Sequence, residues 1–152
     1  MNRNFIFFAS GLFLCCNLFG DALTGQAKLD SLYNALNHSK PDTLRVNTLN
    51  EIAFETRIEN PDTSLFFSKK SFELASQLNY SKGIIVSKMW KGAALSELEE
   101  DDAALQILDD AIRMCDSVIA ATNTTQKKTF SLLKTKVCSV AGIALYVQGK
   151  FE

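Results

Sequence analysis

The sequence predicts an all-α protein. Apolar residues recur at spacings of three and four, which place them on one face of a helix, and Val, Ile and Thr form no alternating runs typical of strands. Only 7 Gly and 2 Pro interrupt 152 residues of which 47% are hydrophobic, enough to build one core. With 16 basic and 17 acidic side chains and no long block of either sign, the chain lacks the charge pattern of a nucleic-acid-binding or membrane-surface protein.

The start of the chain has the pattern of a cleaved signal peptide. A basic residue at Arg3 precedes an apolar run over 5–19, which is shorter than the roughly 20 residues that a membrane-spanning helix needs. Gly25 and Ala27 supply the small residues that a signal peptidase requires. We therefore expect residues 1–27 to be a signal peptide and the protein to be periplasmic or secreted; cleavage after residue 20 is the alternative.

The cysteines leave two questions open. Cys15 and Cys16 suggest a lipid-anchored protein, but the residue before a lipid-modified cysteine should be small and Leu14 is large, so we favour simple cleavage. Removal of the signal peptide leaves Cys115 and Cys138. These two form a disulfide in an oxidising compartment if their geometry permits, or serve as small buried hydrophobic residues.

The mature domain, residues 28–152, is expected to begin with two helices. The apolar spacing predicts a short helix over 28–36 and a second over 44–59. The polar turn at 37–42 separates them and contains His38, the only histidine of the chain. A single turn histidine cannot complete a zinc site and is expected to face solvent.

Two longer helices follow a break at 60–63, where Asp62 or Thr63 is expected to cap the first of them. That helix runs to Asn79, and the next covers 82–98. Both are amphipathic, so each has one face for the core and one for solvent.

The last two helices are predicted over 104–121 and 130–149. The acidic residues at 99–102 stand before the first of them, where they are expected to cap the helix rather than bind a metal ion. The polar, β-branched stretch at 122–126 is expected to be a loop.

Similar residues recur at matching places of successive helix pairs. Gly92 in one helix and Ala104 and Ala111 in the next resemble the small residues of a tetratricopeptide repeat, which let its two helices pack closely. The segment 140–152 resembles the first helix and turn of a further repeat, with Gly142 at the small position. The partner helix of that repeat would begin after residue 152, so the domain is expected to be truncated within its last repeat.

An earlier unit matches less well, because Ser64, Ser68 and Ser71 stand where the family has alanine or an aromatic residue. Its small position is Ala53. The spacings between the units also exceed the roughly 34 residues of the family, which indicates longer helices or inserted loops.

The resemblance implies antiparallel helical hairpins stacked as a right-handed superhelix, with a concave groove for a protein or peptide. By the register of the family, eight residues would face this groove: Asn47, Asn50, Phe54, Arg57, Met89, Ser96, Ser139 and Tyr146. A signal peptide followed by such repeats also resembles the extracytoplasmic sensor region of bacterial membrane-bound signalling proteins that carry a histidine kinase or a DNA-binding domain.

These observations favour an interaction module over an enzyme. No phosphate-binding glycine loop, nucleophile elbow or paired carboxylates occur in the sequence, so we expect no catalytic residue, cofactor or metal. The principal hypothesis is the sensor or docking part of a signal-transduction protein that binds a protein or peptide. A structural spacer or dimerisation scaffold is the alternative, and an exported helical enzyme would need a titratable pair that we do not find.

Overall fold

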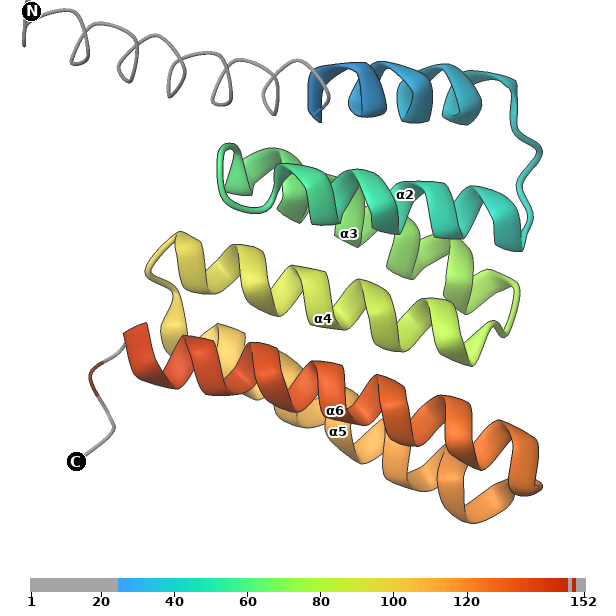
Figure 1. Cartoon of the computed structure of the whole chain (residues 1–152), viewed down its shortest axis with the longest axis vertical. Helices are drawn as coiled ribbons and strands as arrows, with labels where there is room; N and C mark the ends of the chain where they lie inside the picture. The colour runs from blue at the N-terminus through green and yellow to red at the C-terminus, as the bar shows by residue number, and fades with distance from the viewer. Residues whose placement is uncertain (1–24, 148, 150–152) are drawn as a thin grey trace, which may run out of the picture.

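The computed structural model describes residues 25–147 and residue 149. Every regular element in this range is a helix, which confirms the predicted all-α class. Helical residues 25–38 come first, and five helices follow (Figure 1): α2 (Thr43–Thr56), α3 (Pro61–Gln77), α4 (Ser81–Glu97), α5 (Asp101–Ala121) and α6 (Thr124–Val147). The expected signal peptide lies outside the described residues except for 25–27, which are helical.

The helices form two layers, with α2, α4 and α6 in front of α3 and α5 (Figure 1). Each of them packs against its neighbours in sequence, and α4 also contacts both α2 and α6. Short turns join consecutive helices, which therefore run in alternating directions. The largest core cluster lies among α4, α5 and α6 and includes Ile85, Leu108 and Val137.

Asn60 caps α3, and the expectation that Asp62 or Thr63 would do so is wrong. The side chain of Asn60 accepts a hydrogen bond from the backbone N–H of Thr63 at 3.1 Å. Pro61 occupies the first helical position, where its missing N–H costs nothing. The capping residue is therefore Asn60, directly before the proline. Helix α2 ends at Thr56 rather than near residue 59, and residues 57–59 form the turn that leads to Asn60 and Pro61.

The same turn closes α3 and α4. Asn79 and Glu99 have φ angles of 51° and 61°, and each is followed by a residue whose N–H reaches back five positions, from Tyr80 to Ala75 and from Glu100 to Leu95. The acidic stretch at 99–102 therefore ends α4 as well as preceding α5. Its expected capping role is wrong for Glu100, whose side chain makes no capping hydrogen bond within the described structure.

The loop expected at 122–126 is shorter than predicted, because α6 begins at Thr124. Asn123 provides the start of this helix. Its side chain accepts from the N–H of Gln126 at 3.3 Å and its carbonyl accepts from the N–H of Lys127 at 2.9 Å.

Serine side chains allow α2 and α3 to pack closely. Ser64 and Ser71 are fully buried, and their hydroxyl groups donate to the carbonyl oxygens of Ala53 at 2.7 Å and Val46 at 3.2 Å. A small hydroxyl side chain thus replaces the small apolar one of the other units. It keeps the short distance between the helices and adds a hydrogen bond across it.

At Gly92 and Gly83 α4 lies too close to another helix to leave room for a side chain. A Cβ atom on Gly92 would lie 2.6 Å from Leu108 Cγ in α5, and one on Gly83 would lie 2.6 Å from Val46 Cγ1 in α2. Gly142 differs, since a Cβ atom there would meet nothing within 4 Å in the described structure. The packing role expected of small residues therefore holds at Gly92, while Gly142 contacts no second helix here.

Candidate functional site

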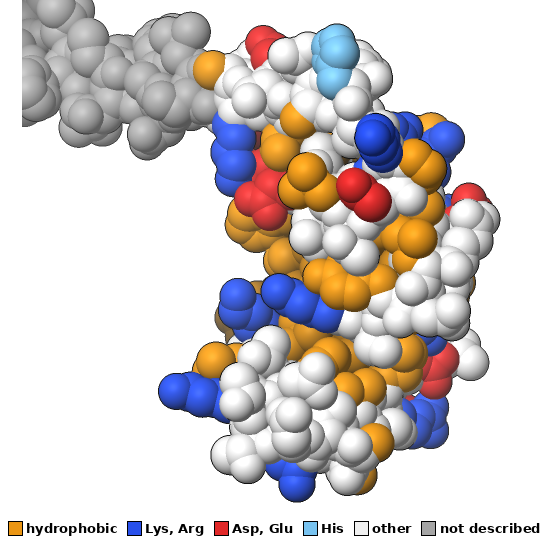
Figure 2. Space-filling view, turned by 90° about the vertical axis from the view of Figure 1, so that its right-hand side faces the viewer, with side chains coloured by type: hydrophobic (Ala, Val, Ile, Leu, Met, Phe, Trp, Pro, Cys, Tyr) orange, Lys and Arg blue, Asp and Glu red, His pale blue; other side chains and the backbone are white. Residues whose placement is uncertain are grey.

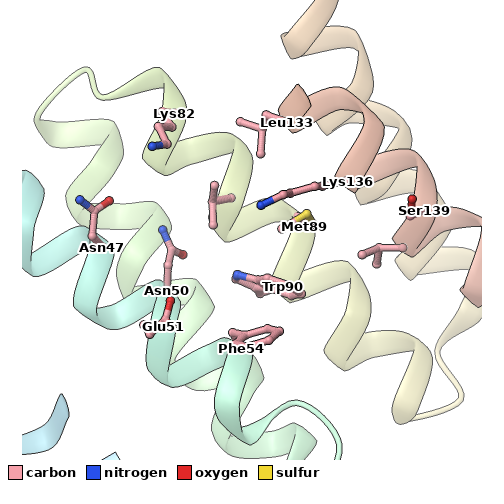
Figure 3. Close-up of a pocket in the computed structure, with 12 residues that line it drawn as sticks. Asn47, Asn50, Glu51, Phe54, Lys82, Met89, Trp90, Leu133, Lys136 and Ser139 are labelled. Carbon is pink, nitrogen blue, oxygen red and sulfur yellow. The ribbon is translucent and has the colours of Figure 1, made fainter. Parts of the chain in front are cut away.

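A groove runs across the layer formed by α2, α4 and α6. In the side view of Figure 2 it is the hollow on the left of the molecule, and Figure 3 shows its walls. It has a volume of ≈ 610 Å³, within the size range of ligand sites. The lining residues are Asn47, Asn50, Glu51 and Phe54 from α2, Lys82, Val86, Met89 and Trp90 from α4, and Leu133, Lys136, Ser139 and Val140 from α6.

Five of the eight residues predicted to face a groove line it, and three do not. The five are Asn47, Asn50, Phe54, Met89 and Ser139. Arg57 lies beside the groove, and Ser96 is buried near the end of α4. Tyr146 is 75% exposed near the end of α6. The predicted positions on α2 and the middle of α4 and α6 thus lie at the groove, which does not reach the ends of α4 and α6.

Aromatic rings form the apolar floor of the groove. The rings of Phe54 and Trp90 lie 4.9 Å apart with an interplanar angle of 47°, which joins α2 to α4. The guanidinium of Arg57 lies over the ring of Phe54, 4.0 Å from its centroid, in a cation–π contact. Arg57 thus supports the groove, although it does not line it.

Asn50 presents an unsatisfied acceptor at the groove. Its side chain is only 4% exposed, and its amide nitrogen donates a long 3.4 Å hydrogen bond to the carbonyl of Gly83. No donor within the described part of the chain reaches its oxygen Oδ1. This oxygen has almost no accessible surface, so a ligand N–H can reach it only if the Asn50 side chain rotates toward the groove. Because a buried acceptor without a partner costs about 1–3 kcal/mol, such a bond would be stabilising.

The acidic side chain that lines the groove comes from α2, and its two lysines come from α4 and α6. On the α2 side Glu51 is paired with Lys28, at 2.9 Å, and Lys28 also contacts Glu55 at 2.5 Å. The hydrogen bonds to Glu55 and Glu51 raise the pKa of Lys28. Lys82 and Lys136 extend into the groove from α4 and α6 (Figure 3), and neither has an ion-pair partner among the residues described.

Sequence reasoning missed most of the charged and aromatic lining. Trp90, which follows Met89 directly, is not among the residues predicted to face a groove, and Lys82 and Lys136 are of a type that usually faces solvent. A sharper signal was present in the spacing. Lys82, Val86 and Met89 follow one another at intervals of four and three residues, so they lie on one face of α4.

The histidine and the two described cysteines do not line the groove. No group of three His, Cys, Asp or Glu residues is placed to hold a metal ion over this range. His38 is exposed at the end of the first helical segment, with Nδ1 2.8 Å from the carbonyl oxygen of Asn34. Cys115 is buried and Cys138 exposed, and both are free thiols in this structure.

None of the helices in the described range is both long and apolar enough to cross a membrane. No protein-family model matches the chain, and neither a curated protein nor a solved structure matches it significantly. The groove itself is therefore the basis for assigning a function.

Proposed function

We propose that the groove of α2, α4 and α6 binds an extended peptide segment of a partner protein. The free acceptor on Asn50 is the observation that carries this proposal. An extended peptide exposes backbone N–H groups along its length, and one of them would satisfy Oδ1 of Asn50 once this side chain has rotated toward the groove. The Asn47 amide and the Ser139 hydroxyl offer further polar partners along the groove.

The apolar floor supports the same ligand. Phe54, Met89 and Trp90 provide a surface on which one apolar side chain of the peptide can pack while its backbone contacts the asparagines. Met89 is only 2% exposed, so the half-buried rings carry most of this contact. A peptide with an apolar residue near its centre is therefore the expected ligand.

The stacking of the hairpins as a tetratricopeptide-like right-handed superhelix is part of this proposal. It is supported by the consecutive helix pairs, the two layers and the close approach of Gly92 to Leu108. We further propose that the domain is the extracytoplasmic sensor or docking part of a signal-transduction protein. The signal-peptide pattern of residues 1–27 supports this location.

The alternative function, a dimerisation scaffold, has one supporting observation. Leu132, Ile143 and Tyr146 of α6 are 60%, 62% and 75% exposed. Exposed apolar residues on one helix are typical of association surfaces. Sedimentation equilibrium of the protein and of an Ile143→Glu variant tests this alternative, since a dimer that dissociates in the variant favours it.

Selection of peptides from a random display library against the protein tests the proposed function. Binding of a selected peptide is followed by the fluorescence of Trp90, the only tryptophan of the chain. We expect Asn50→Ala to weaken binding about tenfold, the value of one hydrogen bond to a buried group. Thr48→Ala, which changes a buried polar residue of α2 that does not line the groove, is the control and should retain affinity.

Two outcomes would reject the proposal. One is a selection that yields no peptide whose binding changes Trp90 fluorescence. The other is that the protein and its Asn50→Ala variant bind every selected peptide with equal affinity while the variant retains the helical circular-dichroism spectrum of the protein.

A further inference from the structure

A second hollow lies on the other side of α4, among α3, α4 and α5. It has a volume of ≈ 310 Å³, at the lower end of the range of small-molecule sites. We call it the lysine pocket; its lining residues are Lys69, Phe72 and Glu73 from α3, Ser87, Lys88 and Lys91 from α4, and Ile107 from α5. It shares no lining residue with the groove.

The basic groups of the lysine pocket outnumber the acidic groups that face it. Lys88 is 3.6 Å from Asp110 of α5, and its ammonium group also lies 5.8 Å from the ring centroid of Phe72. Asp110 in turn contacts Arg113 at 2.9 Å, so its charge is shared between two cations. Glu73 also lines the pocket, but it forms no ion pair within the described structure.

Lys69 and Lys91 form no ion pair in the described structure, and Lys91 is the more buried of the two. Its side chain is partly buried, and no carboxylate in the described part of the chain forms an ion pair with it. Burial lowers the pKa of Lys91, and repulsion from Lys69 and Lys88 lowers it further. Since an uncompensated, partly buried ammonium is destabilising, an anion placed between these lysines would relieve both effects.

The pocket also has an apolar wall. Phe72 is 38% exposed, and Ile107 lines the hollow from α5. Ser87 is buried beneath it, with its hydroxyl donating to the carbonyl of Ile84 at 2.8 Å. An inorganic anion would leave the apolar wall in contact with water, whereas an organic anion would cover it.

We propose that the lysine pocket binds a small organic anion, with its carboxylate or phosphate group among the three lysines and its apolar part on Phe72. This site is separate from the peptide groove, and its function does not depend on the groove being occupied. It would allow a soluble metabolite to bind the same domain as a peptide, on the opposite side of α4.

Amide NMR titrations of the full chain with phenyl phosphate, benzoate and benzyl alcohol test this proposal. We expect phenyl phosphate or benzoate to give saturable shifts in residues 69–73 and 87–91, and the tighter of the two identifies the preferred anionic group. Benzyl alcohol, which has the ring but no charge, should give none. Inorganic phosphate should bind more weakly than phenyl phosphate because it does not cover Phe72.

Three substitutions locate the binding. Lys91→Gln and Lys69→Gln, on different helices, should each weaken binding about tenfold, as loss of a charge-assisted hydrogen bond does. Lys136→Gln, which removes an unpaired lysine of the groove, should change affinity less than about twofold, because a distant exposed charge contributes little. Absence of binding, binding of benzyl alcohol equal to that of benzoate, or equal affinities in Lys91→Gln and Lys136→Gln would overturn the proposal.

Discussion

The ring centroids of Phe54 in α2 and Trp90 in α4 lie 4.9 Å apart, so the groove floor is also a contact between two helices that are not adjacent in sequence. This contact joins α2 to α4 at the base of the groove. It also gives the molecule an internal reporter, since Trp90 is the single tryptophan.

Phe54→Ala should shift the fluorescence emission of Trp90 to longer wavelength, because removal of the neighbouring ring admits water to the indole. The free energy of unfolding should fall by about 2 kcal/mol, less than for a fully buried phenylalanine. Phe66→Ala in α3 is the matched control: Phe66 is 53% exposed and lies outside the groove, so the emission should not move. Equal shifts in the two variants would contradict the assigned floor.

Gly92→Ala should destabilise the protein by about 1–3 kcal/mol, the usual cost of overpacking. The added Cβ would lie 2.6 Å from Leu108 Cγ, so α4 and α5 would have to separate. Gly142→Ala should instead raise the free energy of unfolding by about 0.5–1 kcal/mol, because alanine favours a helix interior and meets no neighbour there. Urea unfolding measures both. Similar losses in both variants would mean that a further helix covers Gly142.

The helices could be predicted from the sequence because their apolar spacing is regular, but their ends depend on single polar groups. Asn123 starts α6 with its side chain and carbonyl, which spacing alone does not reveal. The serines of α3 were interpreted as a weak match, whereas Ser64 uses its hydroxyl to bond α2 directly. Local side-chain bonds of this kind become visible only with coordinates.

The groove was predictable in outline for a different reason. Register places Asn47, Asn50 and Phe54 on one face of α2, so they could be expected together. Lys82 and Lys136 come from helices that are distant in sequence, and only the packing of α4 against α6 brings them to one cavity. The unsatisfied oxygen of Asn50 depends likewise on the position of Gly83 in another helix.

Glu99→Gly should stabilise the protein by about 1 kcal/mol, because Glu99 has a left-handed φ of 61° that glycine adopts without strain. Asn79→Gly, at the matching position with a φ of 51°, should give a smaller gain, since asparagine tolerates this conformation better than glutamate. Thermal unfolding ranks the two. Gln106→Gly, at an exposed position inside α5, is the control and should be destabilising.

Cys115 and Cys138 should differ strongly in their reaction with iodoacetamide at pH 8. Burial raises the pKa of Cys115 to about 11, with the Asp116 charge adding to the effect, so its reactive thiolate is scarce at this pH. Cys138 is exposed on α6 and should be alkylated first. Peptide mass mapping distinguishes the two sites, and adding urea should make Cys115 react at a similar rate. If neither cysteine reacts until a reductant is added, the two are paired in the protein, and the prediction of a free buried thiol at Cys115 is wrong.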